Sequence, residues 1–227
     1  MPWSSFLLDF QQATRSTGFK LLAFTLAFIV MLLLTAHGFE HRLAKIDPTS
    51  LSRMRSFNLA AEGGFGEIFE AGMLLACCAA SADVAWRRRS PVFSVLALIL
   101  AVTLADGLLA LHEQFGFTVG PAIGLHSDTA QLLWFLGLGA ILMPAALVSY
   151  WHSVPDEKVA SLLLLAVFMV LGGFAVGVDA LQSSLNVPNL IEDGGELIAI
   201  ASLCLLMLAV RRALLGRRVN APNGNQR

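Results

Sequence analysis

Charged residues are scarce in this chain, because Asp, Glu, Lys and Arg together make up 14% of its 227 residues while 56% are hydrophobic. A soluble domain of this length carries far more charge, so the composition excludes one and predicts an integral membrane protein. The formal net charge of −1 also excludes a strongly basic nucleic-acid-binding protein. We therefore expect the lipid bilayer as its surroundings and no nucleic acid as a partner.

Several signatures of cofactors and folds are missing as well. The three cysteines, Cys77, Cys78 and Cys204, fall inside apolar runs, which predicts small buried residues and disfavours a disulfide framework. No lysine lies in the middle of an apolar run, where a retinal site would need one, and the five histidines lie near run ends or in loops. The histidine positions disfavour a transmembrane haem, and no glycine-rich phosphate loop or nucleophile elbow is present.

Apolar runs long enough to cross a bilayer recur along the chain. A helix needs about 20 apolar residues to span the hydrocarbon core with its backbone polar groups bonded internally. The predicted spans are Lys20–Gly38, Glu67–Trp86, Pro91–Leu111, Ala130–Trp151, Val159–Leu181 and Gly195–Leu215. The sequence therefore predicts an all-α integral membrane protein with six transmembrane helices, arranged as three helical hairpins.

The segments outside these spans are short. Residues 20–218 form the predicted transmembrane domain, and residues 219–227 form a predicted disordered tail. Residues 1–19 carry apolar side chains at the helical spacing i, i+3, i+4 and i+7, which predicts an amphipathic helix in the membrane interface. These side chains are Trp3, Phe6, Leu7 and Phe10.

The loop on one side of the predicted spans holds only Arg42, Lys45, Arg53 and Arg55, whereas most lysines and arginines gather at the opposite set of span ends. They are Arg15, Lys20, Arg87, Arg88, Arg89, Lys158, Arg211, Arg212, Arg217 and Arg218. Positively charged loops stay on the cytoplasmic side, so both termini are expected in the cytoplasm. The expected location is a cell membrane, and specifically the inner membrane of a bacterium. We expect Asp83 to pair with the arginines that follow it.

The connections on the opposite side are longer. We expect Glu40–Gly66, Gln114–Thr129 and Gln182–Gly194 to be loops that fold over a site. An alignment of GEIFEAGMLLACC with EDGGELIAIASLC pairs Glu67 with Asp193, and suggests repeated hairpins. The alternative is that any two membrane helices with acids near their ends align this well.

Acids and histidines that interrupt the apolar runs gather at this outer end. They are His37, Glu40, His41, Glu67, Glu70, Asp106, His112, Glu113, Asp179, Asp193 and Glu196. An ionisable residue in a membrane is costly unless it is paired, hydrated or bound to something. Glu67 and Asp193 have a simpler interpretation, as anions at positive helix starts. Glu70, Asp106 and Glu196 lie a turn or more inside their runs, so we expect them to point into the bundle.

The segment from His37 to His41 has the sequence HGFEH. Two histidines at i and i+4 on a helix can share a zinc ion, with Glu40 beside them as a general base. The order H-x-x-E-H is that of one class of metalloproteases, although the rest of the chain resembles none of them. The alternative is a helix end at the membrane interface that binds nothing.

These residues together suggest a metal or small-ligand site that faces outward. The predicted ligands are His37, His41, Glu70, Asp106, His112, Glu113 and Glu196, and the predicted metal is zinc, iron or manganese. Glu113 has the alternative interpretation of a solvated carboxylate. A membrane-embedded metal-dependent hydrolase, with Glu40 or Glu70 as the catalytic base, is one alternative function. A cation or proton transporter is another, and catalysis stays open. The uncharged fourth span suggests a membrane-protein partner or a second copy.

Overall fold

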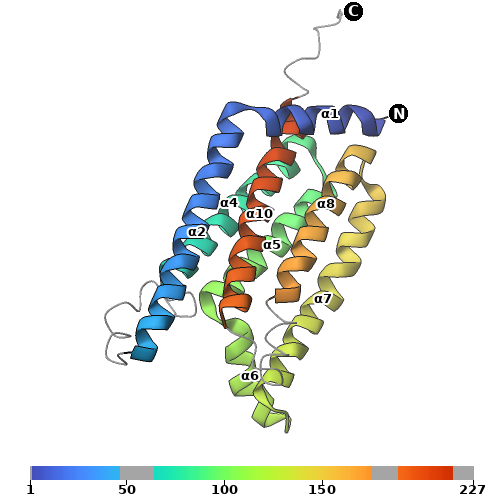
Figure 1. Cartoon of the computed structure of the whole chain (residues 1–227). Coiled ribbons are helices and arrows are strands. Elements are labelled where there is room, and N and C mark those ends of the chain that lie inside the picture. The colour runs from blue at the N-terminus through green and yellow to red at the C-terminus, as the bar shows by residue number, and fades with distance from the viewer. Residues whose placement is uncertain (1, 47–63, 175–188, 217–227) are drawn as a thin grey trace, which may run out of the picture.

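The computed structural model describes residues 2–46, 64–174 and 189–216, and within these ranges the chain is helical and contains no β-strand. The helices, labelled as in Figure 1, are α1 (Pro2–Arg15), α2 (Thr17–Ile46), α4 (Phe65–Arg88), α5 (Pro91–Leu109), α6 (Leu111–Ala122), α7 (Ser127–His152), α8 (Pro155–Gly172) and α10 (Asn189–Gly216). The predicted all-α class is confirmed for this part of the chain.

Five of the described helices are long and apolar enough to cross a membrane, namely α2, α4, α5, α7 and α10. Each contains most or all of one predicted span. The other predicted span, Val159–Leu181, begins in α8, but residues 175–181 lie outside the described part. The helices are therefore those of a multi-pass membrane protein, and a sixth span stays a prediction.

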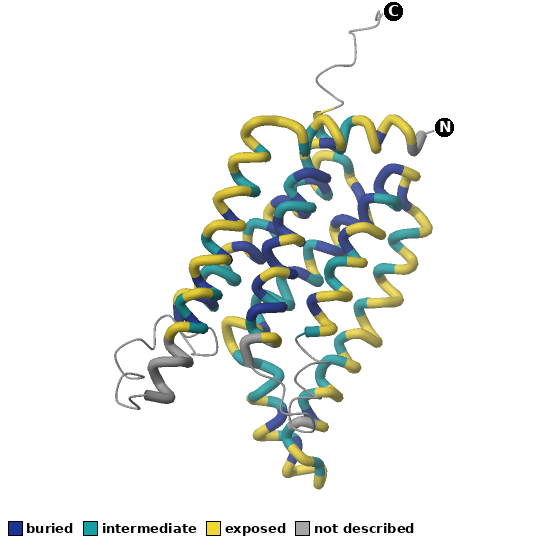
Figure 2. Tube along the Cα trace, viewed as in Figure 1, coloured by how far each residue is buried: buried dark blue, intermediate teal, exposed yellow. Residues whose placement is uncertain are grey.

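The last helix, α10, lies at the centre of the bundle (Figure 1), where it packs against α4, α8, α2 and α1. In its most apolar stretch 61% of the residues are buried, whereas none is buried in the corresponding stretch of α7. Figure 2 shows this contrast along the two helices. Because α7 is both apolar and exposed, its outer surface needs lipid or another membrane protein against it.

The N-terminal helix α1 lies across one end of the bundle (Figure 1). The side chain of Phe6 is fully buried, and Phe10 packs against the core. Leu7 and Leu8 stay exposed. The helix forms where the apolar spacing predicts one, and part of its apolar face packs on the protein itself. Its position in a membrane interface stays a prediction.

The two ends of the bundle differ in charge. One end, called here the arginine end, holds Arg15, Arg87, Arg88, Arg89, Lys158, Arg211 and Arg212. The other, called the acidic end, holds His37, Glu67, Glu70, Asp106, His112, Glu113, Asp193 and Glu196. Helix α1 and the last turn of α10 lie together at the arginine end (Figure 1), where Arg212 donates a hydrogen bond to the Ser16 hydroxyl at 3.2 Å.

Asp83 connects α4 to α10 at the arginine end. Its carboxylate lies 2.6 Å from Nε of Arg87, one turn along the same helix, and 2.6 Å from a terminal guanidinium nitrogen of Arg211 on α10. The predicted pairing of Asp83 with the arginine that follows it is confirmed. The contact with Arg211 adds a link between two helices that are distant in the sequence.

Glu157 is an acid at the arginine end that sequence analysis missed. It is buried in the first turn of α8, accepts a hydrogen bond from the Ser90 hydroxyl at 2.7 Å, and pairs with Arg88 at 3.2 Å. The signal in the sequence is its position just after Pro155, because proline favours the first turn of a helix and the helix dipole favours an acid there.

The connection Gln114–Thr129, expected to be a loop, is largely helical. Helix α6 occupies most of it and packs against α7. Gly116 and Gly120, one turn apart, allow this packing, since a Cβ on Gly116 would lie 2.7 Å from Cγ of Gln131. Glycines suggest a loop in a sequence, but in a membrane protein they also permit close helix contact. Helices α2 and α10 likewise extend into the other two expected loops.

Candidate functional site

The acidic end contains carboxylates from two packed helices. Glu67 and Glu70 lie near the start of α4, Asp193 and Glu196 lie near the start of α10, and the two helices run in the same direction against each other. Glu67, Asp193 and Glu196 all act electrostatically on the carboxyl group of Glu70. We call these four residues the carboxylate cluster. Two acid pairs that are 126 residues apart in the sequence, from position 67 to position 193, thus form one group.

The carboxylate cluster is partly shielded from solvent. Glu67, Glu70, Asp193 and Glu196 are all half-buried. The Oδ2 atom of Asp193 is inaccessible, and no described residue gives it a hydrogen bond. Leaving a buried polar group unsatisfied costs about 1–3 kcal/mol. The charges of the other three carboxylates act on Glu70, and like charges repel unless protons or a cation neutralise them. The cluster is therefore suited to binding positive charge.

Gly195, between the two acids of α10, lets α8 pack beside the cluster. The ring of Phe174, just beyond the end of α8, lies directly against it. A Cβ at position 195 would lie 2.6 Å from Cγ of Phe174, closer than real atoms approach. The absence of a side chain at Gly195 thus fixes how the end of α8 meets the helix that carries Asp193 and Glu196.

A second polar group joins α5, α6 and α7. Asp106 is 6% exposed, and its Oδ1 accepts hydrogen bonds from the backbone N–H of His112 at 3.0 Å and from the indole N–H of Trp134 at 3.1 Å. Its Oδ2 lies 2.9 Å from Nδ1 of His112. Between α5 and α6 the chain passes through Ala110, whose φ of 46° is left-handed and costs an ordinary residue about 1–2 kcal/mol. The Asp106 carboxylate caps α6 and so stabilises this junction.

Asp106 and His112 were predicted as metal ligands, and in the structure they bind each other. The His112 ring also packs against Phe135, with ring centroids 5.2 Å apart. Sequence analysis missed Trp134, the third member of the group. The sequence does not indicate that the Trp134 indole bonds to Asp106, because the two residues lie on different helices.

The remaining predicted ligands are placed separately. His37 is buried on α2, which packs against α10, and Glu113 is half-buried on α6. The side chains of Glu40 and His41 lie outside the described residues. Within the described ranges, no group of three or more His, Cys, Asp or Glu side chains is arranged to hold one metal ion. The described ligands are thus divided between α2, the carboxylate cluster and the helices around the α5–α6 junction.

The cysteines lie further inside the same helices. Cys77 and Cys204 are buried, and their thiols hydrogen-bond to each other between α4 and α10. Cys78 instead donates to the carbonyl oxygen of Ala97 on α5 at 3.5 Å. All three cysteines are free of disulfides; Cys77 and Cys204 are buried as predicted, and Cys78 is half-buried. The repeat alignment places Cys78 on Cys204, whereas the contact between the helices is made by Cys77.

No curated protein and no solved structure matches the chain. Residues 21–210 do match a protein family, DUF8692, whose description is a domain of unknown function. The match runs from α2 into α10, so it includes the carboxylate cluster and the Asp106 group. It covers well over half of the chain, and the chain therefore belongs to the DUF8692 family.

Proposed function

We propose that the protein binds a cation in the carboxylate cluster, on the outer side of the membrane. The observation that carries the proposal is the convergence of Glu67, Glu70, Asp193 and Glu196 from two packed helices. Like charges at short range raise the free energy of the ionised carboxylates, and a bound cation removes that cost. In the described structure the four side chains are not arranged as a metal site, so a divalent ion would have to draw several of them together.

The ligand chemistry favours manganese among the predicted metals. Carboxylate oxygens suit hard cations such as Mn²⁺, whereas zinc and iron are better held when imidazole contributes. A nitrogen ligand from His37, on the neighbouring helix α2, would move the preference towards zinc or iron. Asp106 and His112 stay outside the proposed ligand set, because they bond to each other at the α5–α6 junction.

The test uses the purified full-length chain in nanodiscs. Elemental analysis should find bound metal, and added MnCl₂ should raise the unfolding temperature of the wild type, since a ligand at 100 times its Kd stabilises by about 2.7 kcal/mol. Glu70→Gln and Glu196→Gln should lose this response. Glu113→Gln is the matched control, because it makes the same chemical change at the same end of the bundle but outside the carboxylate cluster.

A second measurement distinguishes the loss of cation binding from destabilisation of the fold. In metal-free protein, Glu70→Gln should unfold at a higher temperature than the wild type, because it removes repulsion within the cluster. The proposal fails if MnCl₂, ZnCl₂ and MgCl₂ leave the wild-type unfolding temperature unchanged. It also fails if Glu113→Gln loses the response as fully as Glu70→Gln.

The two alternative functions make different demands. A metal-dependent hydrolase would use Glu40 or Glu70 as the base, and the HGFEH segment would supply zinc ligands, so that alternative predicts hydrolysis that either Glu40→Gln or Glu70→Gln abolishes. A transporter would need polar groups from end to end of the bundle. Between the carboxylate cluster and Asp83, however, α4 and α10 bury apolar residues such as Leu74, Leu203 and Met207. This packing favours binding over transport.

We also propose that the arginine end is cytoplasmic, with six spans and a location in the inner membrane of a bacterium. The concentration of arginines at one end supports this orientation. Gly18→Cys would place a thiol in open space at the arginine end, and Ile123→Cys an exposed thiol at the acidic end. In a background with the native cysteines replaced by alanine, an impermeant maleimide should label only Ile123→Cys in intact cells. Labelling of Gly18→Cys instead would reverse the orientation.

A further inference from the structure

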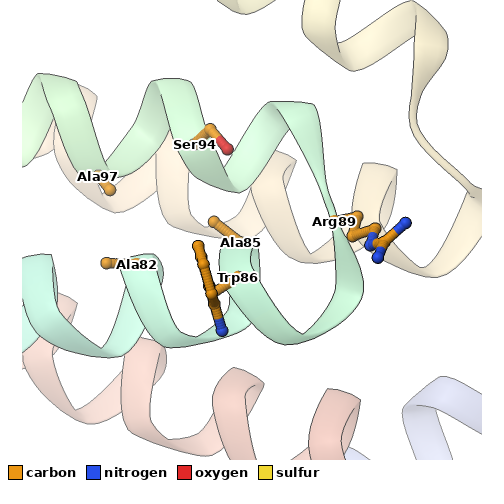
Figure 3. A pocket seen from close by; sticks show the side chains of 6 residues that line it. All are labelled: Ala82, Ala85, Trp86, Arg89, Ser94 and Ala97. Atoms are coloured by element: carbon orange, nitrogen blue, oxygen red, sulfur yellow. The ribbon is translucent and has the colours of Figure 1, made fainter.

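A groove opens between α4 and α5 (Figure 3). It lies near the arginine end, far along α4 from the carboxylate cluster. Its volume is about 570 Å³. It is lined by Ala82, Ala85 and Trp86 of α4, by Arg89 in the turn that follows α4, and by Ser94 and Ala97 of α5. The three positions on α4 follow the spacing i, i+3 and i+4, so they lie on one face of the helix. The groove exists because four of the six side chains are small.

The groove lies on a surface that a bilayer would cover. Both helices are long and apolar enough to cross a membrane, and the side chains of Ala82, Trp86 and Ser94 are exposed. From Ala82 to Arg89 the groove follows α4 for about 10 Å, at about 1.5 Å per residue. In a membrane such a groove takes up hydrocarbon, because an empty space would forfeit dispersion contacts with its walls. The upper part of one acyl chain fits this length.

The mouth of the groove carries a positive charge. Arg89 forms the turn between α4 and α5 with a left-handed φ of 53°, and its side chain extends away from the small residues (Figure 3). Arg87 pairs with Asp83 and Arg88 with Glu157, whereas no residue in the described ranges forms an ion pair or hydrogen bond with the guanidinium of Arg89.

Trp86 indicates how deep in the bilayer the mouth of the groove lies. It is 87% exposed and lies in the last turn of α4, just before Arg89. Tryptophan is enriched where a helix leaves the hydrocarbon for the headgroup region, because its ring is apolar and its N–H is polar. Trp86 therefore places the Arg89 guanidinium at the level of lipid phosphates.

We propose that this groove binds one anionic phospholipid, with an acyl chain between α4 and α5 and the phosphate held by Arg89. A guanidinium binds phosphate oxygens through two parallel hydrogen bonds, and the pair is strengthened by charge. The neighbouring arginines favour a headgroup with net negative charge, because a zwitterionic headgroup brings its own cation beside them. This site is independent of the proposed cation site at the other end of the bundle.

The test compares two lipids with identical acyl chains, phosphatidylglycerol and phosphatidylcholine, by native mass spectrometry of the full-length chain. The wild type should bind phosphatidylglycerol more tightly. Arg89→Gln should weaken that binding about tenfold, the equivalent of about 1.4 kcal/mol, and should leave phosphatidylcholine nearly unchanged. Arg89→Lys, which keeps the charge, should retain part of the preference. Ala82→Leu fills the groove from an exposed position and should weaken the binding of both lipids.

Arg15→Gln is the matched control, since Arg15 is an exposed arginine at the same end but on α1, outside the groove. It should bind phosphatidylglycerol as the wild type does. The proposal is overturned if Arg89→Gln keeps wild-type selectivity, or if Arg15→Gln loses as much. It is also overturned if Ala82→Leu, with an unchanged unfolding temperature, binds both lipids as tightly as the wild type.

Discussion

The Asp106→Ala substitution should open the junction between α5 and α6. The Asp106 carboxylate is 6% exposed and accepts the backbone N–H of His112 at 3.0 Å and the indole N–H of Trp134 at 3.1 Å. Its other oxygen lies 2.9 Å from Nδ1 of His112. Alanine would remove all of these acceptors from a part of the protein that water reaches poorly.

The expected loss follows from these contacts. A hydrogen bond to a charged acceptor contributes about 1.5–3 kcal/mol, and a cap on the first turn of a helix contributes about 1 kcal/mol. Contributions within one network are not additive, so we expect Asp106→Ala to lower the free energy of unfolding by about 3–5 kcal/mol. Asp106→Asn keeps one oxygen for both N–H donors, and His112 can adopt the tautomer that accepts at Nδ1. Its loss should be less than half as large.

Both variants can be compared by thermal unfolding of the full-length chain in one detergent. Amide hydrogen exchange provides a local readout, because the His112 amide loses its acceptor in Asp106→Ala and should exchange faster. Glu113→Gln, at a half-buried acid next in the chain to His112, is the control and should leave both measurements unchanged. If Asp106→Asn is as harmful as Asp106→Ala, or if Asp106→Ala unfolds like the wild type, the hydrogen-bond argument is wrong.

Three further substitutions or conditions test other contacts. Gly195→Ala should lower the free energy of unfolding by about 1–3 kcal/mol, because the added methyl group overpacks against Phe174. Phe174→Leu should relieve this loss. Gly72→Ala is the control and should be neutral or stabilising, because a Cβ there meets nothing within 4 Å. Glu157→Gln removes the buried counter-charge of Arg88 and should lower the free energy of unfolding by about 1.5–3 kcal/mol, so an unchanged unfolding temperature would contradict that ion pair. Binding of Mn²⁺ to the carboxylate cluster should weaken as pH falls, because protons compete for the same oxygens, and a Kd that does not change between pH 7 and about pH 4 would count against carboxylate ligands.

Sequence analysis succeeded for features that depend on residues within a single segment of the chain. Contiguous apolar residues located α2, α4, α5, α7 and α10, because crossing hydrocarbon requires that length and composition. The arginines that closely follow Asp83 in the sequence predicted its ion pair, which Arg87 forms. Helix α6 was missed, since Gly116 and Gly120 resemble loop residues until α7 is known to lie against them. Glu157 was missed because its partners, Arg88 and Ser90, lie together at the turn between α4 and α5, far from it in the sequence.

By itself the sequence determined the class of the protein, most of its spans and the separation of charge between the two ends, because hydropathy and backbone hydrogen bonding act within each segment. The spacing of Glu67 and Glu70 already placed them on one helix face. Only the tertiary structure decided that Asp193 and Glu196 join them, since that depends on the packing of α4 against α10. It likewise decided that the predicted ligands Asp106 and His112 bond to each other. The left-handed backbone at Ala110 turns the chain between them, and a spacing pattern for a continuous helix contains no such turn.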